Sequence, residues 1–325
     1  LYHKKGKYGL ASKEFEKVFS NISHDDDPFI YNLALNEIEI SQKKTILKSK
    51  PRQLGVNLTH RCNINCLMCF YPSSPWDIPE PIVKEVIDYL PYLQRIFWQG
   101  GEPFVYKHFA ELFEKAANYP NLCQTIVTNG LLIDEKWAKR LVNSNTTVVI
   151  SIDGAKKETY EYIRTGARYE DLINNLDILS RYKEKYCTNR HFPPRFELIM
   201  QTTILKSNYS EMGELLEFAR KYKFDGLNLI PIQNVYEPEN IFFHKDRQAI
   251  EHIEKVMPKL ENEARKYSIR LQNSLPSVSM GGDLDKPKKP EDKNKKQPLA
   301  CNFINKNLFC FWPWLSLFIL FAGKV

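Results

Sequence analysis

Two kinds of apolar pattern alternate along most of the chain. From residue 53 onward, short apolar segments alternate with longer segments in which apolar residues recur at helical spacing. The short segments predict strands at Leu54–Thr59, Arg95–Gln99, Gln124–Thr128, Thr147–Ile152, Phe196–Thr203 and Gly226–Ile232. The longer ones predict helices at about 79–90, 107–118, 134–143, 169–185, 209–223 and 245–267. The alternation predicts an α/β domain built around a parallel sheet.

Polar residues before two of these helices predict how the helices begin. Asp134 stands at an expected N-cap position. Asn208 does so as well, and with Glu211 three residues later it has the outline of a capping box.

The first residues of the chain also have a helical pattern. Residues 1 to about 40 carry apolar side chains at helical spacing. Gly6-Lys7-Tyr8 and the later Asp27-Pro28 resemble, weakly, the junction between two tetratricopeptide repeats. An ordinary helical extension is the alternative. Residue 1 is Leu, so we expect the chain to be a fragment, with further repeats before it or with the helix pair packed on the main domain.

The amino-acid composition is ordinary except in one segment, which is rich in lysine and proline. The contents of 43% hydrophobic and 26% charged residues are ordinary for a globular protein. The net charge is +7, and a Pro-rich segment contributes +4 of it, from six lysines against Glu291 and Asp292. Because this segment interleaves no aromatic residues with its lysines, it is typical of a solvated linker and argues against nucleic-acid binding.

The cysteines and the apolar segments indicate a cellular setting. Seven cysteines, three of them within eight residues, do not form the pattern of a secreted disulfide framework, which favours a reducing cytoplasm. The N-terminus lacks the apolar core of a signal peptide. The apolar stretch from Phe309 to Ala322 is short for a membrane span and contains Pro313. We therefore predict a cytoplasmic protein that does not cross a membrane.

Three closely spaced cysteines are the strongest chemical signal. Cys62, Cys66 and Cys69 follow the first predicted strand with the spacing C-x-x-x-C-x-x-C. Structural zinc and a fully ligated iron–sulfur cube each take four protein ligands. Three thiolates on one loop therefore indicate a cluster with one iron left open. The alternative is a zinc site completed by His60 or by a distant Cys.

Other residues of metal-binding type have simpler interpretations. We expect His60 and His108 to pack or cap locally, and Cys123 and Cys187 to be structural.

The triad resembles the signature of the radical S-adenosylmethionine (radical SAM) superfamily. Gln99–Pro103, Thr128–Gly130 and Ser151–Gly154 also resemble motifs that follow strands in that family. The resemblance covers about residues 50–275 and implies a partial (β/α)6 barrel of TIM-like type, whose chemistry gathers at the carboxyl ends of the strands. It further implies that the three cysteines hold a 4Fe–4S cluster, at which S-adenosylmethionine is cleaved to a 5′-deoxyadenosyl radical that abstracts hydrogen from a substrate.

The resemblance also implies a set of cofactor-binding residues. Gly100 and Gly101 are expected to leave amides and carbonyls free to meet a ligand, in a turn that contacts the methionine amino group in the family, with Glu102 supplying negative charge. Arg164 is expected to bind the methionine carboxylate, with Arg168 as a rival. The remaining candidates, expected near the ribose, the adenine or the amino-acid carboxylate, are Pro103, Thr128, Asn129, Ser151, Asp153 and Met68.

The last residues resemble the start of the SPASM or twitch domain, which carries auxiliary iron–sulfur clusters. Cys310, the aromatic segment after it and Gly323 fit that outline, and Cys301 is a further candidate ligand. A β-hairpin capping the barrel is the alternative. The predicted division of the chain is a helical extension (1–45), the core barrel (50–275), the linker (276–299) and the start of the auxiliary domain (300–325).

Members of the family with auxiliary clusters commonly modify peptides or proteins. The resemblance therefore implies a peptide or protein substrate and an electron donor such as flavodoxin or ferredoxin. Two alternatives remain open, a tRNA-modifying enzyme and a non-catalytic binding module stabilised by a metal. The sequence leaves the substrate, the hydrogen-donating residue, the number of auxiliary clusters and the oligomeric state open.

Overall fold

The computed structural model describes residues 8–69, 74–187, 195–232, 238–276 and 316–319. Its strands are β1 (Gln53–Asn57), β2 (Arg95–Gln99), β3 (Cys123–Thr128), β4 (Thr146–Ser151), β5 (Phe196–Ile204), β6 (Gly226–Pro231), β7 (Arg270–Asn273) and β8 (Ser316–Ile319). Its helices are α1 (Tyr8–Phe19), α2 (Pro28–Ser41), α3 (Glu80–Tyr89), α4 (Phe109–Ala117), α5 (Glu135–Val142), α6 (Lys157–Ile163), α7 (Tyr169–Cys187), α8 (Met212–Lys221) and α9 (Arg247–Lys266).

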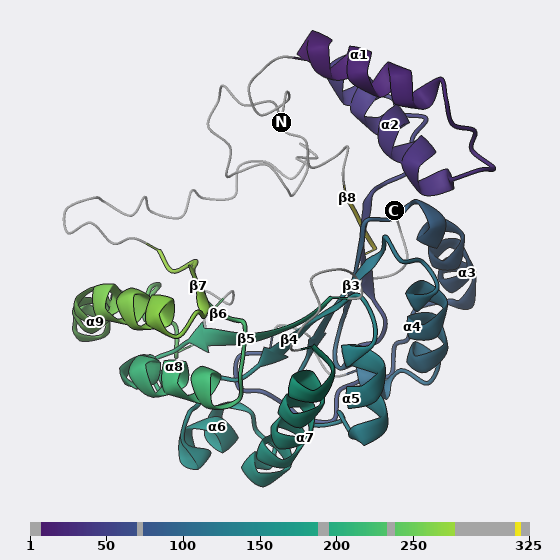
Figure 1. Ribbon diagram of the computed structural model, residues 1–325. Coiled ribbons are helices and arrows are strands. Elements are labelled where there is room, and N and C mark those ends of the chain that lie inside the picture. Colours follow the sequence, from purple (N-terminus) through teal and green to yellow (C-terminus); the bar gives the residue numbers. More distant parts are fainter. Residues whose placement is uncertain (1–7, 70–73, 188–194, 233–237, 277–315, 320–325) are drawn as a thin grey trace, which may run out of the picture.

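All the described strands form one parallel sheet, in the order β7-β6-β5-β4-β3-β2-β1-β8. Figure 1 shows helices α3 to α9 along the outer side of this curved sheet. From β1 to β7 the strands follow sequence order, as successive right-handed βα units place them. This arrangement confirms the predicted α/β fold with a partial TIM-like barrel.

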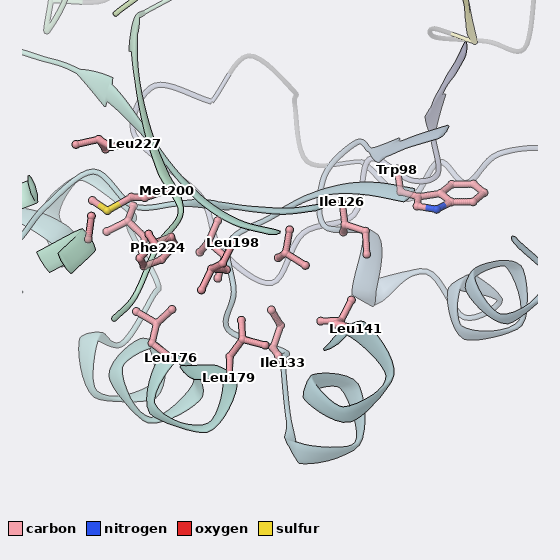
Figure 2. Packing of buried hydrophobic residues seen from close by; sticks show 14 of the residues in the cluster. Trp98, Ile126, Ile133, Leu141, Leu176, Leu179, Leu198, Met200, Phe224 and Leu227 are labelled. Carbon is pink, nitrogen blue, oxygen red and sulfur yellow. The ribbon is translucent and has the colours of Figure 1, made fainter. Parts of the chain in front are cut away.

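The main core lies between the sheet and its outer helices. Alternate strand residues such as Trp98, Ile126 and Leu198 are fully buried and face apolar side chains of the helical layer, among them Leu141 and Leu176 (Figure 2). Because side chains alternate across a strand, the residues between them point to the opposite, concave face. The outer helices therefore cover only one face of the sheet, and the side chains of the concave face point away from them.

The N-terminal helices are confirmed, and α2 packs on the segment that leads into β1. The buried carboxylate of Glu39 accepts the backbone N–H groups of Lys48 and Ser49, at 2.9 and 3.1 Å. Glu37 forms an ion pair with Arg52 just before β1 (2.5 Å). These bonds show how the helical extension is fixed to the barrel.

The secondary structure differs from the prediction at three places. The short helix α6 and the strand β7 were not predicted. The capping box at Asn208 is wrong, because Asn208 Oδ1 accepts from Leu205 N at 2.8 Å and not from the first turn of the helix, and Glu211 accepts from Ala155 N and Thr159 Oγ1. By contrast Asp134 caps α5 as predicted, accepting from Trp137 N at 2.7 Å. The Asn208 oxygen is thus used by the turn just before the helix, and the Glu211 carboxylate by groups near the start of α6.

The end of the chain contributes one described element. Strand β8 pairs in parallel with β1, with Ser316 opposite Gln53. The proposed auxiliary ligands Cys301 and Cys310 lie outside the described residues. None of the described helices is both long and apolar enough to cross a membrane.

Candidate functional site

The cysteine loop, residues 60–69, is tied at both ends by backbone hydrogen bonds. Gly101 N donates to Thr59 O at 2.6 Å and Glu102 N to Arg61 O at 2.9 Å, which joins the start of the loop to the end of β2. Farther along, Asn65 N and Leu67 N donate to Thr165 O and Ile163 O, both at 2.8 Å, at the carboxyl end of α6. The loop is therefore held at the carboxyl ends of the strands, across the mouth of the barrel.

The glycine pair after β2 has a packing role that sequence alone did not reveal. Gly100 has φ +132°, and a Cβ at Gly101 would lie 2.2 Å from the carbonyl oxygen of Arg61. Only glycine allows the two backbones to approach this closely. The expectation that the amide of this turn is free for a ligand is wrong for Gly101, because its N–H already donates to Thr59.

Glu102 lies at the centre of a buried network between β2 and β3. Its side chain is 0% exposed and accepts from Thr128 Oγ1 and Asn129 N, each at 2.8 Å. Asn129 Nδ2 in turn donates to Asn63 Oδ1 at 2.7 Å and lies 3.9 Å from Cys62 Sγ. Burial raises the pKa of Glu102 to about 7, although the surrounding donors oppose the shift. The network connects the two strand ends to the cysteine loop.

A second network connects β4 and α6 to the same loop. Arg164 Nη2 lies 2.5 Å from Asp153 Oδ2, and its Nη1 donates to Cys66 Sγ at 3.4 Å. Asp153 is fully buried and also accepts Thr203 N, at 2.7 Å. Burial opposes the charge on Arg164, yet Asp153 and then Cys66 raise its pKa. Arg164 thus places a buried positive charge beside one thiol of the triad.

The three thiols have the donor chemistry for an iron–sulfur cluster. Burial raises the pKa of Cys62 and of Cys66. The charge of Cys69 adds to both rises, whereas Arg164 opposes the rise at Cys66. Cys62 and Cys66 are half-buried and Cys69 is exposed, so the loop opens to solvent on one side. Among the described residues, no three metal-ligating side chains are already gathered as in a formed metal site. The residue types fit the cluster, and within the residues that the structure describes no fourth metal-ligating side chain joins the three thiols.

The other predicted residues differ in their surroundings. Ser151 is half-buried, and no hydrogen bond of its hydroxyl is recorded within the described residues. Met68 packs against a small apolar cluster of Ile163, Leu205 and Ile232. Pro103 is buried at the start of a short 3-10 helix, and Arg168 is exposed beside Asp171. The cofactor roles of these residues stay predictions.

Two histidines, His60 and His108, and the two other described cysteines lie in surroundings separate from the three thiols. His60 Nδ1 lies 3.1 Å from Ser74 Oγ, and its ring packs on Trp76. His108 precedes α4 and makes no side-chain capping bond. Cys123 lies on β3 near Thr147, and Cys187 lies at the end of α7 near Val142. None of these four joins the triad.

Sequence reasoning missed two buried polar groups near the site. Tyr160 on α6 is 0% exposed, and its hydroxyl makes no hydrogen bond within the described residues. Asn57 ends β1 and is likewise 0% exposed, with neither side-chain polar atom bonded. The sequence did contain a signal for Asn57. It is a polar residue between the core residues Val56 and Leu58, so the alternation along β1 places its side chain on the opposite, concave face of the sheet.

The fold and the cysteine loop together define an α/β barrel with a three-cysteine loop at its mouth. The family model of the radical SAM superfamily matches residues 56–219, about half of the chain, and the chain belongs to this superfamily. This confirms the resemblance on which the sequence prediction was based.

Several relatives are similar to part of the chain. A cysteine-type anaerobic sulfatase-maturating enzyme of Clostridium novyi is 28% identical over 192 residues, 52% of this chain and 48% of its own length. The mycofactocin maturase MftC of Mycolicibacterium smegmatis is 27% identical over 178 residues, 53% of this chain and 42% of its own. The chain spans about half the length of these curated relatives.

Solved structures share the fold at low identity. The structure of SuiB from Streptococcus suis has a TM-score of 0.55 and 19% identity, covering 85% of this chain and 60% of its own. The structure of anSMEcpe with bound AdoMet has a TM-score of 0.55 and 18% identity, covering 69% of this chain and 61% of its own. At this identity the likeness shows the fold.

Proposed function

We propose that the chain is the catalytic core of a radical SAM enzyme that abstracts hydrogen from a peptide or protein. The observation that carries the proposal is the cysteine loop, which is fixed by backbone bonds to β2 and α6 at the mouth of the barrel. Cys62, Cys66 and Cys69 would hold a 4Fe–4S cluster, which when bound supplies the electron that cleaves S-adenosylmethionine. The chain itself orients the thiols and places charge beside them.

The two networks supply that orientation. Arg164 donates to Cys66 Sγ, and Asn129 links the end of β3 to Asn63 beside Cys62. Hydrogen bonds to a thiolate sulfur stabilise its negative charge and tune the potential of the centre that it ligates. We therefore assign Arg164 and Asn129 as positioning residues for the cysteines.

The substrate class rests on what the relatives are named for. One relative is named for the maturation of sulfatases, which are proteins, and another for the maturation of mycofactocin. A solved structure of SuiB contains its precursor peptide, SuiA. A peptide or protein substrate, auxiliary clusters held by residues near Cys301 and Cys310, and a small redox protein as electron donor complete the proposal. The tRNA alternative has no feature among the described strands in its favour.

Anaerobic reconstitution tests the proposal directly. We expect about four iron and four sulfide per chain at the triad, and 5′-deoxyadenosine after reduction in the presence of S-adenosylmethionine. Cys66→Ala should lose this iron and all product, whereas Cys123→Ala, whose sulfur lies on β3 away from the triad, should retain both. Product formed by Cys66→Ala, or a wild-type chain that binds only zinc, would refute the assignment.

A further inference from the structure

Four polar side chains form a continuous row across half of the sheet. Ser151 on β4 lies opposite Gln201 on β5, which lies opposite Asn228 on β6, which lies opposite Gln272 on β7. Directly opposed residues of neighbouring parallel strands point to the same face, with strands about 4.8 Å apart. We call these four residues the polar row.

The polar row lies on the concave face of the sheet. The residues that flank Gln201 and Asn228 along their strands, Met200, Thr202, Leu227 and Leu229, are all 0% exposed. Met200 and Leu227 belong to the core that packs against the outer helices (Figure 2). Since side chains alternate, Gln201 and Asn228 point away from those helices, and both are half-buried.

The row presents hydrogen-bonding groups that the described part of the chain does not use. No side-chain hydrogen bond is recorded for Ser151, Gln201 or Asn228, while Gln272 shares a long one with Ser274. Each side-chain amide offers both a donor and an acceptor. A ligand that covers these groups has to satisfy them, since an unpaired buried amide is costly.

The strands that carry the row hold one pair of opposite charges and no other charged residue. Glu197 near the start of β5 forms an ion pair with Arg270 at the start of β7, at 3.5 Å. Below the row, Val149 and Ile199 lie opposite each other as an apolar layer. A phosphate-bearing polymer requires cationic side chains, whereas neutral amides above an apolar floor match a peptide main chain.

The row also leads toward the cysteine loop. Thr128 at the end of β3 lies opposite Ile150, the residue before Ser151. Asn129, the residue after Thr128, reaches Asn63 and Cys62. A polymer lying on β5 and β6 would therefore extend toward the thiol site at the mouth of the barrel.

We propose that Gln201 and Asn228 bind the main chain of an extended peptide substrate on the concave face, recognising its amide groups rather than its side chains. This inference rests on the proposed function and adds the mode of substrate recognition. Recognition of this kind tolerates many side chains near the reacting position, because each side-chain amide pairs with a backbone N–H or C=O that every residue provides.

The test uses a probe that offers little except main chain. The reconstituted full chain, saturated with S-adenosylmethionine, is titrated with acetyl-(Ala-Gly)4-amide, and the dissociation constants of peptide and S-adenosylmethionine are measured separately. The variants are Gln201→Met and Asn228→Leu, which keep side-chain size, with Asn228→Ser for the case that leucine prevents folding. Gln248→Met, at an exposed position on α9, is the matched control.

Loss of one amide pair should weaken peptide binding about three- to tenfold in each row variant, with the control unchanged. The affinity for S-adenosylmethionine should change less than twofold. The inference is overturned if the wild-type chain does not bind the probe, if the row variants bind it as well as wild type does, or if they lose affinity mainly for S-adenosylmethionine. A wild-type chain that yields no 5′-deoxyadenosine refutes the proposed function instead.

Discussion

Replacing Glu102 by Gln should change the pH dependence of stability in a predictable direction. Glu102 is fully buried, and its pKa is raised from 4.5 to about 7, chiefly by burial. Between these two values the folded protein retains a proton that the unfolded chain has released. The free energy of unfolding therefore falls as the pH rises through this window, and it levels off above about pH 7.

The magnitude follows from the two pKa values. Between about pH 5 and pH 8, the difference in unfolding free energy between wild type and Glu102→Gln should fall by about 2.5 kcal/mol. A separate cost of about 1–3 kcal/mol, independent of pH, is expected because the amide group cannot accept from both Thr128 Oγ1 and Asn129 N. Taking the difference between the two proteins cancels the titration of all groups that they share.

Urea unfolding of the iron-free, reduced chain at several pH values measures this difference. Glu85→Gln, at an exposed position on α3, serves as the control for removal of one carboxylate. If the difference between wild type and Glu102→Gln stays flat with pH, or rises as the pH increases, then burial does not control this carboxyl and the reasoning is refuted.

Three further outcomes follow from the same contacts. Gly101→Ala should lower the unfolding free energy by about 3 kcal/mol, since its Cβ would meet Arg61 O at 2.2 Å. Gly213→Ala in α8, with open space around it, should raise the unfolding free energy by about 0.5–1 kcal/mol. Equal effects of the two variants in calorimetry would contradict this. Arg164→Leu should cost about 3–5 kcal/mol because it leaves Asp153 buried and unpaired. Adding Asp153→Asn to Arg164→Leu should restore most of that loss in a double-mutant cycle, and simple additivity would show that the pair is not coupled.

The sequence determined the sheet and the place of the cysteine loop. Six of the strands and the main helices were predictable because alternating apolar segments can bury their faces only in a layered α/β arrangement. Asp134 was predictable as a cap since its bond to Trp137 N is local. Cys62, Cys66 and Cys69 were predictable as a group because their spacing confines them to one loop. Helix α6 and strand β7 were not predicted, because neither is long enough for its apolar residues to show a clear helical or strand period.

The tertiary structure alone decided how the motif residues are used. Glu102 and Asp153 appear in the sequence as carboxylates available to a ligand, yet in the fold each is buried, the first among the donors of β3 and the second beside Arg164. Asn208 does not cap its helix, because its Oδ1 accepts from Leu205 N, while its amide donates to the carbonyls of Thr203 and of the distant Asp153. The hydrogen-bond partners of these side chains depend on which groups from other segments the fold brings near them. No local pattern contains that information, because burial makes any unmet donor or acceptor costly only after the fold has formed.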